Sequence, residues 1–270
     1  IAVTSFLPMI LYPMTDAVLL IVIAPSYANP IIYIFVGGFI LALAMQKWNL
    51  HKRIALSIIS ITGTNMRQII LGFILASAFL SMWISNIATT MVMMPTVLAI
   101  IANIKKEDQK TAAPIMLLAT AYAASIGGTA SLTGTAPNLI CLNVFEDQFA
   151  GANPISFGTW IMFGFPTALT FLIVSFLFLK RGLPKGKKVD IVDDIPKKMS
   201  FEEKTIAIIF AMVALLWFTR KDITIGSYEM TGWGSLLPYG NLFSDATVAI
   251  FFSVLLFIIP STKRKKDGSF

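Results

Sequence analysis

Runs of apolar residues, separated by short polar segments, alternate along most of the chain. A helix needs about 20 residues to cross roughly 30 Å of hydrocarbon, and several runs approach or exceed that length. These predicted spans are residues 1–23, 29–46, 155–179, 205–219 and 243–260. Segment 50–62 predicts an amphipathic helix along the membrane interface. Its apolar residues at helical spacing are Leu50, Ile54, Ile58 and Ile61. The pattern predicts an all-α fold, that of a polytopic helical membrane protein.

Two further apolar segments are too long for a single crossing. Residues 69–101 contain no charge, and basic residues flank both ends, so both ends belong on the same side of the membrane. We therefore predict a re-entrant hairpin, with its tip in the polar stretch 85–90. Residues 112–145 are also uncharged, but 127–138 are too rich in Gly, Thr and Pro for a regular helix. This segment predicts a broken helix with an unwound centre.

The composition excludes most other classes of protein. The chain is 56% hydrophobic and 13% charged, whereas soluble proteins carry about 25% charged residues. The single cysteine, Cys141, and the single histidine, His51, leave no disulfide framework, no zinc cluster and no histidine-based triad, which excludes most hydrolase chemistry. The net charge of +7 resides in short segments between apolar runs, which argues against nucleic-acid binding.

The basic segments also predict the topology. By the positive-inside rule, residues 47–68, the basic loop 180–204 and the tail 261–270 lie in the cytoplasm. The hairpin then enters the membrane from the cytoplasmic side. Helix 155–179 leads inward from the broken helix to the basic loop.

The two interruptions are candidate binding sites. Irregular backbone at membrane depth is tolerated only where it is buried in protein or lines a watery cavity, and broken helices in transporters mark binding sites. Ser, Thr and Asn supply oxygen ligands for sodium, and their hydroxyls and amides can donate to a carboxylate. Because both segments lack Asp, Glu, Lys, Arg and His, sodium coupling is more natural than proton coupling. The alternative is that small polar residues merely allow close helix packing.

Three motifs, in order, carry a family resemblance. Residues 81–90 (SMWISNIATT) resemble the Ser-Asn-Thr hairpin of the divalent anion:sodium symporters, the sodium-coupled dicarboxylate and citrate carriers. Residues 127–138 resemble that family's unwound helix, and 48–56 its interfacial arm. The resemblance covers nearly the whole chain. It implies an elevator-type symporter of di- or tricarboxylates such as succinate or citrate, working as a homodimer in the lipid bilayer of the plasma membrane.

The same resemblance implies the domains and the site. Residues 63–179 would form a mobile transport domain, and residues 1–62 with 205–260 a fixed scaffold. Sodium would be bound by Ser81, Ser85, Asn86, Gly134 and Asn138. The carboxylate substrate would meet Asn86, Ile87, Thr133 and Gly134. Ile87 stands where the family has Thr, and a lost hydrogen bond to a charged group is worth about 1.5–3 kcal/mol.

The family pairs two inverted repeats, and no second Ser-Asn-Thr motif follows here. We therefore expect an N-terminal half that does not transport alone. The alternative is a truncated, non-transporting membrane subunit that dimerises with an intact carrier and inhibits it. An integral-membrane enzyme has little support, because no cluster of ionisable catalytic groups is visible.

Overall fold

The computed structural model describes residues 29–149, 151, 155–183, 198–225 and 228–262. Three sequence predictions lie wholly or partly outside this set: the span 1–23, the centre of the basic loop 180–204, and most of the tail 261–270.

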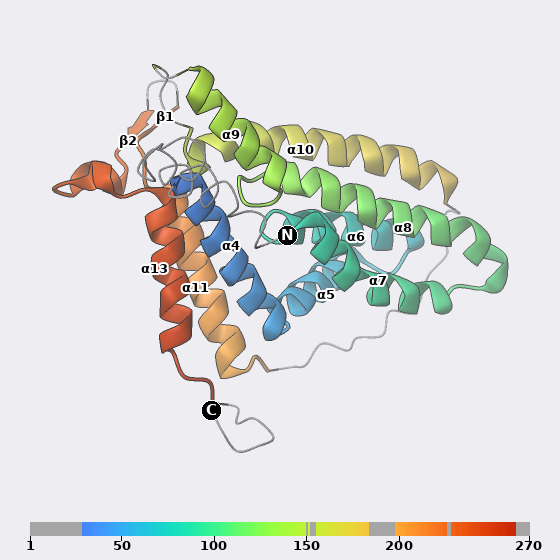
Figure 1. Cartoon of the computed structure of the whole chain (residues 1–270). Coiled ribbons are helices and arrows are strands. Elements are labelled where there is room, and N and C mark those ends of the chain that lie inside the picture. Colours follow the sequence, from blue (N-terminus) through green and yellow to red (C-terminus); the bar gives the residue numbers. More distant parts are fainter. Residues whose placement is uncertain (1–28, 150, 152–154, 184–197, 226–227, 263–270) are drawn as a thin grey trace, which may run out of the picture.

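The described residues are almost entirely helical (Figure 1), which confirms the predicted all-α fold. The chain also forms a small antiparallel pair of three-residue strands, which the sequence pattern did not predict. The helices are α4 (Pro30–Lys47), α5 (Leu50–Thr62), α6 (Met66–Ser81), α7 (Asn86–Ala102), α8 (Lys106–Thr129), α9 (Ala136–Gln148), α10 (Phe157–Leu179), α11 (Phe201–Phe218), α12 (Trp233–Leu236) and α13 (Asp245–Ile258). The shorter elements are β1 (Ile223–Ile225), β2 (Tyr228–Met230) and the 3-10 turns η1 (Lys180–Gly182) and η2 (Gly240–Leu242).

Side-chain caps begin several of these helices. Asn29 accepts the N–H of Ile31 at 2.9 Å, and Pro30 occupies the first turn of α4, where a missing N–H costs nothing. Ser156 and Ser200 cap α10 and α11 in the same way. Each cap therefore marks the point where the chain turns from a polar connection into an apolar helix.

Helices α4, α11 and α13 form one bundle (Figure 1). Gly37 of α4 lies directly against α13, since a Cβ at Gly37 would lie 2.5 Å from the Cβ of Ala249. The buried hydroxyl of Ser253 on α13 donates to the carbonyl of Gly37 at 3.0 Å. Larger residues at Gly37 would force the two helices apart.

A second group of helices packs around α8. Helices α6, α7 and α10 contact α8, and α5 lies along α6. The close approach of α6 to α8 depends on Gly127, because a Cβ there would lie 2.3 Å from the carbonyl oxygen of Ala78. The fully buried side chains at the centre of this group include Ile70, Phe73, Met93 and Met116.

The two predicted interruptions are present. Helices α6 and α7 are joined by residues 82–85, so 69–101 is a helical hairpin and not one long helix. The broken helix is also confirmed, but its unwound centre is 130–135 and not the predicted 127–138. Gly127 stays helical with the α6 backbone at Ala78 packed against it, and Gly128 with the Asn86 side chain of α7 against it. Pro137 lies in the first turn of α9, where proline is favoured. Helix α8 starts earlier than expected, at Lys106, with Glu107 and Asp108 in its first turn, where acidic side chains are stabilising.

Some apolar residues of helix α5 are buried in the protein, and others are exposed on its surface. Leu50, Ala55 and Ile59 are buried, whereas Ile61, part of the predicted apolar stripe, is 83% exposed. His51 is also buried, and its Nδ1 lies 3.0 Å from the carbonyl oxygen of Met45. The histidine therefore helps to fix the connection between α4 and α5.

Burial lowers the pKa of His51 from its ordinary value of 6.5, and the neighbouring Lys52 adds to this shift. The unfolded chain then binds a proton more readily than the folded one, so the stability contributed by neutral His51 is present above pH 6.5 and declines as the pH falls below it. We expect the melting temperature of the wild type to fall between pH 7 and pH 5 by more than that of His51→Gln. Thermal denaturation in detergent measures both, and equal slopes would contradict the prediction.

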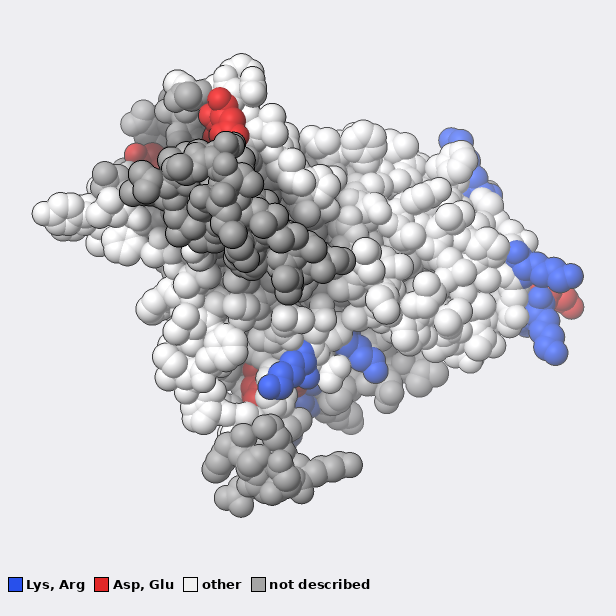
Figure 2. All heavy atoms as spheres, viewed as in Figure 1, with Lys and Arg blue, Asp and Glu red and all other residues white. Residues whose placement is uncertain are grey.

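Three described helical segments are long and apolar enough to cross a membrane: Pro30–Lys47, Lys106–Thr129 and Phe157–Gly182. Figure 2 shows the basic side chains at the right and lower edges of the molecule, with a few acidic atoms beside them, and acidic atoms without basic ones at the upper left. The position of the basic side chains agrees with the charge pattern used for the topology. Which side faces the cytoplasm stays a prediction.

Candidate functional site

The turn of the α6–α7 hairpin lies against the break between α8 and α9. The hydroxyl of Ser131, in the break, donates to the carbonyl of Met82, in the turn. A Cβ at Gly134 would lie 2.7 Å from the carbonyl oxygen of Ser81 and 2.5 Å from that of Gly128. The two irregular segments therefore share one buried location, and only glycine fits at position 134 with this backbone.

Oxygen atoms gather where the two segments meet. The Ser81 hydroxyl donates to Asn86 Oδ1 at 2.7 Å, and Asn86 Oδ1 lies against Gly128, where a Cβ would be only 2.2 Å from it. Asn138 Nδ2 donates to the carbonyls of Gly128 at 2.9 Å and Ser131 at 2.7 Å. Ser81 and Asn138 are buried. The cluster thus consists of neutral hydroxyl, amide and carbonyl oxygens.

Four of the five predicted sodium-binding residues meet in this cluster: Ser81, Asn86, Gly134 and Asn138. The fifth, Ser85, is the N-cap of α7, and its hydroxyl accepts the N–H of Ala88 at 3.3 Å. That hydroxyl stabilises the start of α7, and Ser85 directly precedes Asn86 of the cluster in the sequence.

A cavity of about 340 Å³ adjoins the cluster. The hairpin tip and the break form one wall, and α4 forms the other through side chains that include Phe35, Phe39 and Leu43. All four predicted substrate residues line the cavity: Asn86, Ile87, Thr133 and Gly134. Ile87 is 75% exposed, so its apolar side chain is available to whatever enters.

The electrostatics of the cavity favour an anion. Helices α7 and α9 both begin at its wall, where Ser85 to Ala88 and Thr135 to Ala136 line it. The N–H groups of a first helical turn have no partner within the helix, and the helix dipole places partial positive charge there. The described lining contains no Lys, Arg, Asp or Glu. Backbone N–H groups and amides are therefore the means by which this cavity can hold negative charge.

Sequence reasoning missed the residues of the opposite wall. Gln46 of α4 is the polar side chain that this helix brings to the cavity. Trp83, in the hairpin turn, also lines the cavity, and its ring packs edge-on against Phe210 of α11, with ring centroids 4.6 Å apart. A glutamine inside an apolar run was the available signal for Gln46. Nothing local indicated which helix Trp83 contacts.

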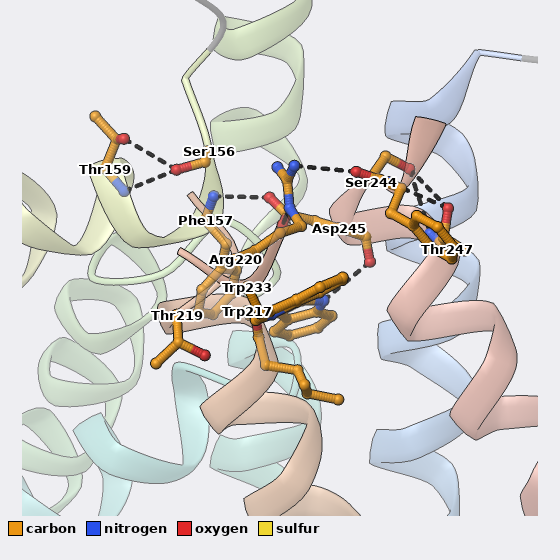
Figure 3. A network of polar contacts seen from close by, with 12 residues as sticks. Ser156, Phe157, Thr159, Trp217, Thr219, Arg220, Trp233, Ser244, Asp245 and Thr247 are labelled. Carbon is orange, nitrogen blue, oxygen red and sulfur yellow. Dashed lines mark hydrogen bonds and ion pairs between the residues drawn. The ribbon is translucent and has the colours of Figure 1, made fainter. Parts of the chain in front are cut away.

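A buried ion pair was also missed, although Asp245 falls inside the predicted span 243–260. Asp245, which is 7% exposed, pairs with Arg220 Nε and accepts the backbone N–H of Phe157 at 2.9 Å (Figure 3). The indole N–H of Trp217 donates to the backbone carbonyl of Asp245 at 2.9 Å, and Arg220 Nη1 donates to the carbonyl of Phe243 at 3.1 Å. One carboxylate therefore joins the start of α10, the end of α11 and the start of α13.

Comparison with known proteins agrees with this architecture. The sequence model of the citrate transporter family matches residues 1–260. The chain belongs to this family. The predicted resemblance to sodium-coupled dicarboxylate and citrate carriers is thus confirmed at the level of the family, and the chain is an integral membrane protein. Membership in a family of transporters also agrees with the expectation that the chain is not an enzyme.

Similar curated proteins come from Staphylococcus aureus. The sodium-dependent dicarboxylate transporters SdcS of strains NCTC 8325 / PS 47, COL and MRSA252 are each 37% identical to the chain over 284 aligned positions. The alignment covers 98% of this chain and 52% of each relative. The chain therefore spans about half the length of the curated relatives that it matches.

Proposed function

We propose that this chain provides a sodium site and a carboxylate site for sodium-dependent dicarboxylate transport. The observation that carries the proposal is the juxtaposition of a buried oxygen cluster with a cavity at which two helices begin. The names of the Staphylococcus aureus relatives, sodium-dependent dicarboxylate transporters, support the choice of ion and substrate.

Sodium is proposed to bind in the oxygen cluster. Hard cations prefer oxygen ligands, and the cluster beside Gly134 contains hydroxyl, amide and carbonyl oxygens. Ser81, Ser85, Asn86, Gly134 and Asn138 are the proposed ligands. Because these groups are neutral, a bound sodium ion would leave net positive charge beside the cavity. That charge would favour entry of an anion.

The carboxylate is proposed to bind at the starts of α7 and α9. There it would accept hydrogen bonds from the Asn86 side chain, from the backbone and hydroxyl of Thr133, and from the backbone of Gly134. Ile87 would contact the hydrocarbon part of the substrate, because its side chain is exposed and apolar. Neither step requires an ionisable protein group, which fits the uncharged lining of the cavity.

An elevator mechanism is part of the proposal. The cavity lies between α4, which belongs to the proposed scaffold 1–62 and 205–260, and the hairpin tip of the proposed transport domain 63–179. The division itself rests on the family resemblance, because the hydrophobic clusters cross it: one joins α5 to α6, α7 and α8, and the other joins α4, α11 and α13 to α9 and the start of α10. A homodimer embedded in the bilayer completes the proposal and rests on the family resemblance.

Sodium-dependent binding of succinate tests the proposal directly. The purified 270-residue chain in lipid nanodiscs should bind labelled succinate in sodium chloride and not in choline chloride at the same ionic strength. Binding isolates the site from any need for a complete transport cycle. Asn86→Ala should reduce the affinity by about 10- to 100-fold, because it removes a donor to a charged ligand and a sodium ligand together.

The matched control is Asn143→Ala. Asn143 is an asparagine of α9 that bonds Asn29 at 2.9 Å and lies outside the oxygen cluster. The Asn143→Ala variant should bind succinate as the wild type does. Binding that is equally strong in choline, or that survives Asn86→Ala unchanged, would contradict the proposed site.

A further inference from the structure

A second cavity, of about 350 Å³, lies on another face of α4. It is formed by the end of α4, the start of α11 and the end of α13. Leu43 is the one described residue that lines both this cavity and the candidate substrate site. Most of the wall is apolar and includes Ile40, Leu256 and Phe257. Phe257 is 78% exposed, so this groove opens to the surroundings of the helices.

Two opposite charges line the same groove. Lys47, in the last turn of α4, lies beside Trp48, with its ammonium 5.6 Å from the ring centroid. Glu202, in the first turn of α11, is the acidic residue. Tryptophan and lysine at the end of a membrane-spanning helix are typical of the interface between hydrocarbon and headgroups. The charged end of the groove thus lies at the level expected for lipid headgroups.

One oxygen of Glu202 lacks a hydrogen-bond donor. Its Oε1 accepts bonds from the Ser261 hydroxyl at 3.1 Å, the Thr262 N–H at 2.9 Å and the Thr262 hydroxyl at 2.7 Å. Its Oε2 is buried, as is the residue as a whole, which is 5% exposed. In the described part of the chain this oxygen has no hydrogen-bond partner. A buried carboxylate oxygen without a donor is costly, and natural proteins rarely leave one. A ligand with an N–H donor would satisfy it.

We propose that this groove binds a phospholipid with a zwitterionic, primary-amine headgroup, such as phosphatidylethanolamine. The lipid phosphate would lie at Lys47, the ammonium would donate to Glu202 Oε2, and an acyl chain would follow Leu43 and Leu256. A choline headgroup has no N–H to donate. An anionic headgroup would place negative charge beside Glu202. The two charges and the apolar wall together therefore select the aminophospholipid, whether or not the chain transports dicarboxylates.

Native mass spectrometry of the purified chain in detergent tests the lipid site. Phosphatidylethanolamine, phosphatidylcholine and phosphatidylglycerol with identical acyl chains are added in turn. We expect phosphatidylethanolamine to bind about 10-fold more tightly than the other two, which is the factor expected for one charge-assisted hydrogen bond. Equal binding of phosphatidylethanolamine and phosphatidylcholine would overturn the proposal. So would a chain that dimerises without retaining lipid, because a second copy would then cover the groove.

Variants separate the two headgroup contacts. Glu202→Gln should abolish the preference for phosphatidylethanolamine, and Lys47→Met should weaken all three phospholipids. Ser261→Ala removes one hydrogen bond to Glu202 Oε1 without changing the charge, so it should keep the preference for phosphatidylethanolamine. This variant controls for a general weakening of the contact between Glu202 and the residues that follow α13. Lys110→Met, at an exposed lysine of α8 that does not line the groove, should bind as the wild type does. A preference that persists in Glu202→Gln would exclude Glu202 as the headgroup partner.

Discussion

Asp245→Ala is expected to lower the free energy of unfolding by about 3–5 kcal/mol, the usual cost of removing one partner of a buried ion pair. The substitution leaves the Arg220 guanidinium without its carboxylate and the Phe157 N–H without its acceptor. Both groups are largely buried, so water cannot fully replace the lost carboxylate. Reversible unfolding by SDS in mixed micelles measures the change.

Two further variants make the interpretation specific. Arg220→Met combined with Asp245→Ala should be less destabilised than the sum of the single variants, because no unpaired charge remains. Glu107→Ala removes an exposed acid from the first turn of α8 and should cost about 1 kcal/mol or less. A loss at Asp245 no larger than at Glu107 would show that the pair contributes little. If the loss of stability in the double variant equals the sum of the losses in the two single variants, the two side chains do not stabilise each other.

The helices could be predicted because their signal is local. An uncharged run of the required length predicts a span wherever it occurs, and the predicted 155–179 became Phe157–Leu179. Helix ends were less accurate, because caps and tertiary contacts decide them. Lys106 belongs to α8 although the uncharged run starts later, and Gly127 stays helical because α6 packs on it.

The two breaks were predictable for the same local reason, since Gly, Thr and Pro interrupt an apolar run. The remainder of the site depends on contacts between segments far apart in sequence. Trp83 meets Phe210, Phe35 and Gln46 face the hairpin tip, and Asp245 bonds Phe157 across 88 positions. No single stretch of sequence contains that information. Ile87 was named from its position in the hairpin motif, and its exposure into the cavity became visible only in the folded chain.

Asn138→Ala is expected to remove about half or more of the stabilisation that sodium gives the chain. Asn138 is 6% exposed, and its amide holds the carbonyls of Gly128 and Ser131 in place beside Gly134. The substitution removes a proposed sodium ligand and also releases two other oxygens of the cluster. A hydrogen bond or ligand to a charged group is worth about 1.5–3 kcal/mol, so the affinity for sodium should fall by about 10- to 100-fold.

The measurement is the difference in stability between sodium chloride and choline chloride for each variant. A ligand at 100 times its dissociation constant stabilises a protein by about 2.7 kcal/mol, and the predicted loss of affinity reduces this to about 0.4–1.4 kcal/mol. Taking the difference between salts cancels the structural cost of the substitution, which is the same in both. Asn143→Ala, on the same helix but outside the cluster, should retain the full effect of sodium.

The two asparagines also separate a binding role from a packing role. If Asn138 only stabilises the start of α9, Asn138→Ala lowers the melting temperature equally in both salts and the sodium effect survives. If Asn138 is a ligand, the melting temperature in choline changes less than the melting temperature in sodium. An undiminished sodium effect in Asn138→Ala would therefore place the ion elsewhere, while leaving the packing of the break against the hairpin turn as described.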